Sequence, residues 1–527
     1  MERLLNLIYQ IEKEKEGEKP KEGPFLEVSE VTKKMAEIYE AIRNIVEIRE
    51  EHLLRRAAIE RIIRRQIFVE RKKKIDAKEV LLELIRAGYL KNNALPESEV
   101  PKFEAKVKLF FPLTQDLEIE SSPKIFSFFA SILSVEFEKL FDEKFFEKEK
   151  LLANLCFSKL KPLIKSFPKE ISQKESDLLL YLSILKVIFK NDEALLKNYL
   201  FNSWLKNEIQ KEAFSSEKLK NKRLKIIEEI EKYLSHPYFP KYQAFVKKYR
   251  LCFWLYFEAL EELAILSKSK EEFFEKVSLK EKVLKAVERV YFRKVEEVSK
   301  KMKRVILRSI LFLLFTKIIL TLILEYPYEK YFLKKLNYLA LIANTLFHPF
   351  CLAIFGIFSF KPQSQIELIK TSIEEMFFEK EPKKIVLFSK ISSPSGIGNF
   401  ILKILWSISF VLVWYFIIKV LLIFKFNLIS IILFVIFLSL VFYLGWRAQG
   451  LRKELILKEK ESFLGTLALF FALPIIKLGE WISKKFSKYN LIIYVLDFLV
   501  ESPFKLILKF LERWIFYTRE KKEEIET

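Results

Sequence analysis

The sequence predicts an all-α protein in which a cytoplasmic helical domain precedes a multi-pass helical membrane domain with C-terminal amphipathic helices. Long apolar runs fill the second half, and residues 336–360 contain no Asp, Glu, Lys or Arg. The first 300 residues are charged and repeat their apolar side chains at three- and four-residue steps, which indicates helices. Only ten glycines occur in 527 residues. Tight hairpins and phosphate-binding loops depend on glycine, so its scarcity argues against them.

The basic charge lies among the apolar segments. Of a net charge of +22, residues 301–527 hold 32 Lys and Arg against 18 Asp and Glu. A nucleic-acid-binding protein concentrates such charge on a soluble domain or tail. Lys and Arg beside apolar spans instead mark the cytoplasmic ends of membrane helices. The charge therefore favours a lipid bilayer as the partner and argues against nucleic acid.

The polar half divides into a tail and a helical domain. Residues 1–24 are predicted to be a flexible tail, whose apolar run is too short for a signal peptide. Residues 25–300 are predicted to be a soluble helical domain, split near 95–121 by a proline-containing linker or irregular segment. The Arg- and Glu-rich stretch at 50–71 is interpreted as a solvated helix face. A basic docking surface is the alternative there, and a coiled coil also fits the charged helices.

Four segments are predicted to cross the bilayer within a membrane domain at 305–446, at about 305–325, 336–360, 401–424 and 426–446. A hydrocarbon core of roughly 30 Å needs about 20 helical residues. The first segment is the poorest because it contains charge. With four spans and a cytoplasmic N-terminus, the inner connections hold 17 Lys and Arg and the outer ones four. This distribution follows the positive-inside rule and predicts an inner-membrane protein with both termini in the cytoplasm.

The C-terminal residues 447–527 are predicted to form a basic segment and interfacial or re-entrant amphipathic helices. Residues 463–476 are apolar but short for a span, 491–500 are shorter still, and 504–517 separate charged from apolar side chains. Residues 365–380, in the loop after the second span, show a similar pattern. That loop segment fits either an interfacial helix or a helix packed in a soluble domain.

Lys317 is the most informative single residue, because it falls in the middle of the first predicted span. A lysine stem reaches roughly 6 Å, too short to bring the ammonium to either membrane surface. An intramembrane lysine must have a partner, face water, or show that its segment does not span. Asn344 and His348 on the next span are the candidate partners. Glu325, two turns along the same helix, is expected to lie too far away for a direct i,i+4 pair.

Three roles for Lys317 stay open: a structural polar contact, a tilted or interfacial segment, and a transport or binding site. The chain shows no catalytic constellation, so no catalytic residue, cofactor or enzymatic activity is predicted. The cysteines are far apart and the histidines isolated, which gives no metal site. The Gly-containing loop at 395–399 lacks the residues of a P-loop or a dinucleotide fingerprint.

Several short motifs lie in and around the first two predicted spans and near the C-terminus. They are Thr316-Lys317, Leu324-Glu325-Tyr326-Pro327-Tyr328, Leu336-Asn337-Tyr338 and Phe347-His348-Pro349, with Leu496-Asp497-Phe498 and Ser502-Pro503-Phe504-Lys505 near the C-terminus. Together they resemble a pattern in an uncharacterised family of bacterial multi-pass membrane proteins. The resemblance implies a membrane location and no activity.

These observations predict an interaction or scaffolding membrane protein that presents a cytoplasmic helical domain to a cytoplasmic protein partner. The alternative is a transporter or channel component that uses Lys317, Asn344 and His348 inside the membrane. The Pro-interrupted second span also favours that alternative, because transport folds use broken helices at the midplane.

Overall fold

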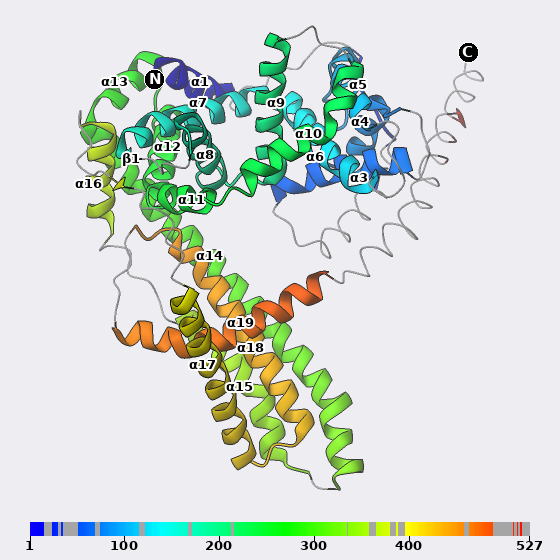
Figure 1. Ribbon diagram of the computed structural model, residues 1–527, viewed down its shortest axis with the longest axis vertical. Helices are drawn as coiled ribbons and strands as arrows, with labels where there is room; N and C mark the ends of the chain where they lie inside the picture. Colours follow the sequence, from blue (N-terminus) through cyan, green and yellow to red (C-terminus); the bar gives the residue numbers. More distant parts are fainter. Residues whose placement is uncertain are drawn as a thin grey trace. The chain divides into compact units, whose positions relative to one another are not determined.

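The computed structural model describes residues 1–14, 24–29, 33–34, 51–68, 74–114, 122–166, 171–211, 216–334, 336–357, 365–379, 386–387, 396–457 and 463–488, with Phe510, Trp514, Tyr517 and Thr518. Nearly all of these residues are helical, which confirms the all-α prediction (Figure 1). One short parallel ladder pairs β1 (Ile164–Ser166) with β2 (Val386–Leu387). The chain forms two compact units. Unit 1 is Met1–Lys161, Ser172–Val246 and Asn490–Thr527, and unit 2 is Pro162–Ile171 and Lys247–Tyr489.

Unit 1 is built from short helices around a core rich in phenylalanine. Several of these helices have an N-cap side chain that bonds the backbone of their first turn. At the start of α8, for example, Ser172 and Glu175 form a capping box. Phe103 and Phe137 meet edge to face in the core. The described helices are α1 (Glu2–Glu14), α3 (Glu51–Phe68), α4 (Ala77–Arg86), the 3₁₀ turn η1 (Glu97–Glu99), α5 (Val100–Thr114), α6 (Ser122–Phe141), α7 (Glu143–Leu160), the 3₁₀ turn η2 (Lys161–Leu163), which runs on into unit 2, α8 (Gln173–Val187), α9 (Glu193–Lys211), α10 (Ser216–Leu234) and α11 (Phe239–Lys247), which ends at the boundary of the unit.

Two parts of unit 1 differ from the expectation. Of the N-terminal segment predicted to be flexible, residues 2–14 form α1, whose apolar side chains are buried, and residues 15–23 lie outside the described residues. The segment predicted to be irregular at 95–121 contains helix α5. Pro101 does not prevent this, because it lies in the first turn of the helix, where a missing N–H breaks no bond. Pro112 lies only two residues before the helix ends, and residues 115–121 lie outside the described residues.

Unit 2 is organised around α14 (Lys280–Leu320), a helix of 41 residues. Its first half packs against α12, α13 and α16, and its second half against α15 and α18. After Leu320 the chain continues in two π-helical turns, η3 (Thr321–Glu325) and η4 (Tyr328–Phe332). The other helices are α12 (Arg250–Ile265), α13 (Lys270–Ser278), α15 (Tyr338–Ile357), α16 (Ile366–Phe377), α17 (Gly396–Ile423), α18 (Leu428–Lys453) and α19 (Phe463–Lys488).

Helix α16 resolves the two interpretations of residues 365–380. Ile369 and Ile373 are fully buried, and Phe377 stacks on Tyr256 of α12 at 3.7 Å between ring centroids. Lys370 adds an ion pair with Glu288 of α14 at 2.7 Å. These contacts are those of a helix packed in a protein core.

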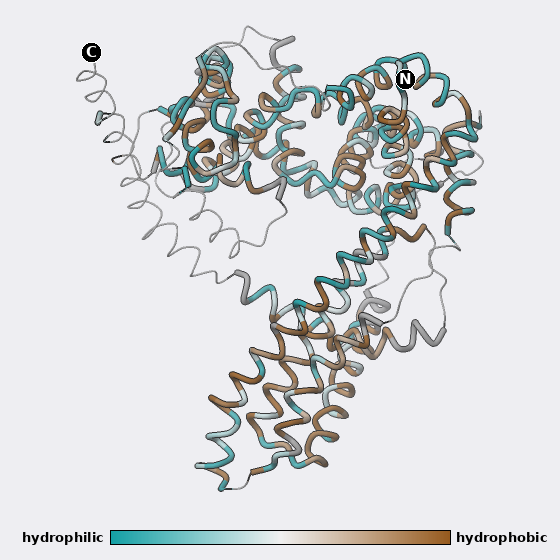
Figure 2. Tube along the Cα trace, turned by 180° about the vertical axis from the view of Figure 1, so that it is seen from behind, coloured by the Kyte–Doolittle hydropathy of each residue, from teal (hydrophilic) through white to brown (hydrophobic). Residues whose placement is uncertain are grey.

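Three helices in the described part of the chain are long and apolar enough to cross a bilayer: Lys280–Phe332, Lys403–Ile423 and Leu428–Arg447. The sequence predicts four spans, and the apolar part of α15, Leu341–Ile354, is shorter than this criterion requires. Large apolar side chains cover the outer faces of these helices, including Phe416 and Ile423. The tube in Figure 2 is correspondingly brown along this bundle.

Helix α19 crosses α18 at a very close approach. A Cβ added to Gly479 would lie 2.0 Å from the carbonyl oxygen of Ser439. Only glycine therefore permits this crossing. The apolar run predicted at 463–476 is the first half of α19. The predicted segments at 491–500 and 504–517 lie outside the described residues, apart from Phe510, Trp514 and Tyr517.

Candidate functional site

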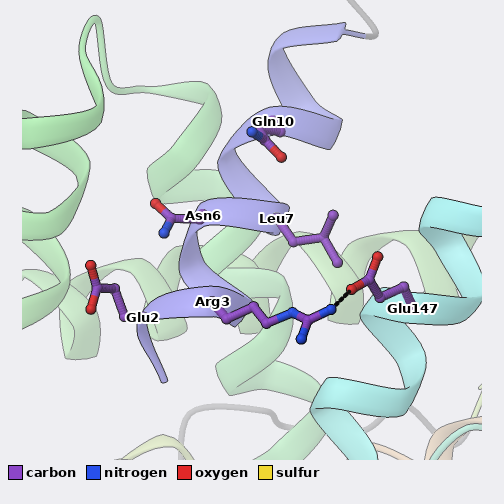
Figure 3. A pocket seen from close by; sticks show the side chains of 6 residues that line it. All are labelled: Glu2, Arg3, Asn6, Leu7, Gln10 and Glu147. Atoms are coloured by element: carbon purple, nitrogen blue, oxygen red, sulfur yellow. Dashed lines mark hydrogen bonds and ion pairs between the residues drawn. The ribbon is translucent and has the colours of Figure 1, made fainter.

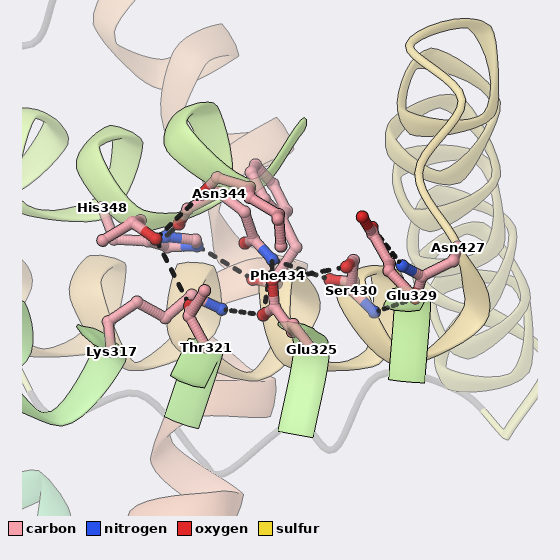
Figure 4. A network of polar contacts seen from close by, with 11 residues as sticks. Lys317, Thr321, Glu325, Glu329, Asn344, His348, Asn427, Ser430 and Phe434 are labelled. Carbon is pink, nitrogen blue, oxygen red and sulfur yellow. Dashed lines mark hydrogen bonds and ion pairs between the residues drawn. The ribbon is translucent and has the colours of Figure 1, made fainter. Parts of the chain in front are cut away.

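The four polar residues singled out from the sequence come together inside the apolar bundle of unit 2. Lys317 lies on α14, Glu325 ends η3, and Asn344 and His348 lie one turn apart on α15 (Figure 4). All four are 0% exposed. Burying ionisable groups this completely is costly unless they are paired and hydrogen-bonded, so their partners decide what the site can do.

Lys317 and Glu325 form a direct ion pair, with Nζ 2.9 Å from Oε1. The prediction that Glu325 lies too far along the helix is therefore wrong. In a regular α-helix, residues eight apart are separated by about 12 Å along the axis and roughly 80° around it. The π turn η3 replaces i,i+4 bonds by i,i+5 bonds and so places more residues in each turn. Two turns then return Glu325 to the face of Lys317.

The Glu325 carboxylate also accepts hydrogen bonds from two other helices. Asn344 Nδ2 donates to Oε1 at 2.8 Å and to Oε2 at 3.0 Å, and Ser430 Oγ of α18 donates to Oε2 at 3.3 Å. These bonds fix the Asn344 amide, because the flipped amide would point its oxygen at the carboxylate. The oxygen Oδ1 of Asn344 is left buried without a donor among the described residues.

His348 places both ring nitrogens against backbone carbonyls. Nδ1 lies 2.9 Å from the oxygen of Asn344, and Nε2 lies 3.1 Å from the oxygen of Phe434 in α18. Carbonyl oxygens only accept hydrogen bonds, and a neutral imidazole has one N–H to donate. Both contacts are satisfied at once only when the ring carries a second proton.

Glu329 belongs to the same site and is missed by the sequence reasoning. It is 3% exposed, and its carboxylate accepts from Asn427 Nδ2 at 2.7 Å and from the backbone N–H of Asn337 at 2.9 Å. The sequence carries a signal for it, since Glu325 and Glu329 are four residues apart and share a helix face. The topology prediction did not use this signal, because it counted only Lys and Arg in the connections between spans.

The site is thus a continuous polar network along the helices, and an apolar cluster follows it at one end. The polar network consists of Lys317, Glu325, Glu329, Asn337, Asn344, His348, Asn427 and Ser430. It starts at the two connections 333–337 and 424–427 and reaches Lys317, whose ammonium lies 4.9 Å from the ring centroid of Phe437. Next along the helices comes an apolar cluster of Met302, Ile306, Leu313, Leu352, Phe437 and Val441.

Unit 1 holds a buried polar cluster of a different kind. Glu136 is contacted by Lys106 at 2.6 Å, Lys139 at 3.1 Å and Asn198 at 2.7 Å. Burial alone would raise the pKa of Glu136, but the two ammonium groups and the amide lower it to about 2. The carboxylate is fully satisfied, so this cluster ties α5, α6 and α9 together and leaves no group free for chemistry.

A polar groove of about 380 Å³ lies beside α1 and α7 in unit 1 (Figure 3). Its main contact is an exposed ion pair between Arg3 and Glu147 at 2.5 Å, and it contains no buried titratable group. Among the described residues, no group of three His, Cys, Asp or Glu side chains is placed to hold a metal ion.

No protein-family model, curated protein or solved structure matches the chain.

Proposed function

We propose that the chain is a multi-pass inner-membrane protein in which the second half of α14 with its π turns, α15, α17 and α18 cross the bilayer. The length and apolar character of three of these helices support this. Lys300, Lys301, Lys303 and Arg304 lie at one end of the bundle with Arg447 and Lys453. The positive-inside rule assigns that end, and both termini, to the cytoplasm.

The proposed role is that of a transporter or channel component for small ions, which is the second of the two functions suggested by the sequence. The observation that carries it is the complete burial of the Lys317–Glu325 pair among apolar helices. A buried ion pair adds little net stability compared with apolar side chains of the same size. Intramembrane ionisable residues that face a bundle interior typically mark ion pathways. A purely structural bundle would be as stable without them.

A scaffolding role is favoured by a separate observation, the size of unit 1. The helices of unit 1 pack a core of their own, and every residue of the polar network lies in unit 2. We propose that this region offers a docking surface to a cytoplasmic protein partner, which is compatible with ion transport by unit 2.

Ion flux through liposomes tests the transport role. Purified full-length protein would be reconstituted with dyes that report H⁺, K⁺ and Na⁺ inside the vesicles. We expect flux of at least one ion, and its loss in the double variant Lys317→Met/Glu325→Gln, which removes the pair without leaving a lone charge. The matched control is Lys403→Met/Glu367→Gln, which neutralises an exposed lysine and an exposed glutamate. Wild-type flux no greater than that of protein-free liposomes, for all three ions, would refute the role.

A further inference from the structure

Helix α19 runs across the bundle of unit 2, whereas α14, α15, α17 and α18 run along it (Figure 1). Gly479 is the point of closest approach, where the helix backbone meets Ser439 of α18. The buried face of α19 packs on α17 and α18, and its Ile475 shares an apolar cluster with Trp414 and Phe434. If the bundle crosses the bilayer, a helix that crosses the bundle in this way lies close to the plane of the membrane.

The place of this crossing along α18 gives the depth of α19 in the membrane. Residues 428–446 carry no charge and Arg447 follows them, so Arg447 marks the cytoplasmic boundary of the hydrocarbon core. Gly479 packs against Ser439 and Tyr443, which precede Arg447 by roughly 12 and 6 Å along the helix axis. Helices of the membrane interface lie about 5–10 Å deep, between headgroups and acyl chains. The position of α19 therefore matches the interface of the cytoplasmic leaflet.

The face of α19 that points away from α17 and α18 carries aromatic and basic side chains together. Trp481 is 58% exposed and Phe471 is 52% exposed. Large apolar side chains and lysines on one exposed face are typical of a helix that meets acyl chains and headgroups at once. We name this face the α19 stripe, and it consists of Phe470, Phe471, Lys477, Trp481, Lys484 and Lys485.

The lysines of the α19 stripe outnumber the carboxylate beside them. Lys477 and Lys484 both contact Glu480, at 2.7 and 2.6 Å, so three lysines and one glutamate leave a net charge of +2. The side chains of Lys477 and Lys484 are 58% and 68% exposed, and such exposed pairs are weak enough for another anion to compete. A lysine stem of roughly 6 Å brings the ammonium from the depth of α19 to the level of the lipid phosphates.

We propose that the α19 stripe binds the phosphates of anionic phospholipids in the cytoplasmic leaflet, with its aromatic side chains among the upper acyl chains. Charge complementarity favours an anionic headgroup over a zwitterionic one, whose own ammonium the lysines repel. Arg304 of α14 and Arg447 of α18, which are also exposed, extend the basic surface onto the neighbouring helices. This inference rests on the membrane location in the proposed function and adds the class of lipid that the protein selects.

Quenching of a fluorophore on α19 by labelled lipids tests this surface in the full-length protein. Phe471→Cys, in a background with the three native cysteines replaced by Ala, would carry the fluorophore in vesicles of phosphatidylcholine and phosphatidylglycerol. Either lipid would carry a nitroxide, placed near the headgroup or deep in the acyl chain. We expect the shallow nitroxide to quench more than the deep one. We expect phosphatidylglycerol to be enriched about fivefold over phosphatidylcholine at the fluorophore, which is the effect of one lysine at an anionic lipid surface.

Neutral side chains on the stripe should remove the preference for phosphatidylglycerol. In Lys477→Gln/Lys484→Gln/Lys485→Gln we expect the two lipids to quench equally, while the shallow nitroxide still quenches more than the deep one. The matched control removes the same charge from exposed sites on α13 and the first half of α14, and it should keep the preference. That control is Lys270→Gln/Lys282→Gln/Lys285→Gln.

The outcomes separate the lipid preference from the proposed function. Equal quenching by both lipids in the wild type, or a preference that survives in the stripe variant, would overturn the binding of anionic lipid and leave the membrane location standing. Absence of quenching by either lipid would overturn both. A confirmed preference in a protein whose liposomes show no ion flux would leave the lipid surface standing and refute only the transport role.

Discussion

The ammonium of Lys317 lies 2.9 Å from the carboxylate of Glu325, although the two residues are eight positions apart on one continuous helical segment. The π turn at Thr321–Glu325 makes this pair by rotating the later residue back to the earlier face. The same turn directs Glu325 toward α15 and α18, whose Asn344 and Ser430 complete its hydrogen bonds. One local change in helix geometry thus assembles a site from three helices.

Removing one member of this pair should destabilise the protein far more than removing both. Lys317→Met leaves the Glu325 carboxylate buried without its cation, and we expect a loss of about 3–5 kcal/mol in unfolding free energy. Lys317→Met/Glu325→Gln should recover most of this loss, because no buried charge remains. Resistance to pulse proteolysis in detergent measures both. A double variant as unstable as the single one would show that the charges themselves hold the helices together.

The proposed topology predicts on which side of the membrane each end of the helix bundle lies. In a background with Cys156, Cys252 and Cys351 replaced by Ala, Tyr331→Cys introduces a thiol where the side chain is 68% exposed, near the connection at 333–337. A membrane-impermeant thiol reagent should label this variant on intact cells. The Glu297→Cys variant, on the first half of α14, should react only after the membrane is opened. The reverse pattern would invert the proposed topology.

Gly479→Ala should disrupt the crossing of α18 and α19. The added Cβ would overlap the Ser439 carbonyl, so the helices must separate. We expect a cost of about 3 kcal/mol, at the upper end for overpacking. Gly450→Ala is the matched control, because nothing lies within 4 Å of its Cβ position and a helical alanine gains roughly 0.5–1 kcal/mol over glycine. Thermal unfolding in detergent should therefore shift down for the first variant and slightly up for the second.

Glu136 predicts an acid-sensitive component of the stability of unit 1. Its pKa falls from 4.5 to about 2 on folding, so the ionised carboxylate stabilises the fold above about pH 4.5. That contribution is about 3 kcal/mol and is lost as the pH falls toward 2. The stability difference between wild type and Glu136→Gln should shrink over this range.

Pulse proteolysis of unit 1 sites in the full-length protein at pH 6, 4 and 3 measures this difference. Glu97→Gln, in an exposed pair with Lys78, is the control and should change little, because exposed pairs contribute less than about 1 kcal/mol. A constant difference for Glu136→Gln across the range would mean that its carboxyl titrates normally in the folded protein.

The sequence by itself determined the helices and the apolar segments, because both follow from local patterns. The spacing of apolar side chains predicts a helix wherever it recurs, and the absence of charge from 336–360 and 426–446 identifies apolar helices without any knowledge of their neighbours. Lys317 was recognised as unusual for the same reason, since a charge in an apolar run is visible in one dimension. Local rules failed at Val100–Thr114, where they treat proline as a breaker although Pro101 lies in the first turn of a helix.

Only the tertiary structure decided which polar groups meet. The pairing of Lys317 with Glu325 depends on a π turn that no residue pattern announces, and the partner of His348 Nε2 is a backbone carbonyl 86 residues away. Glu329 joined the site only when α18 brought Asn427 to it. Distances between segments far apart in the chain depend on the packing of whole helices, so the sequence revealed the charged residues and the fold revealed their chemistry.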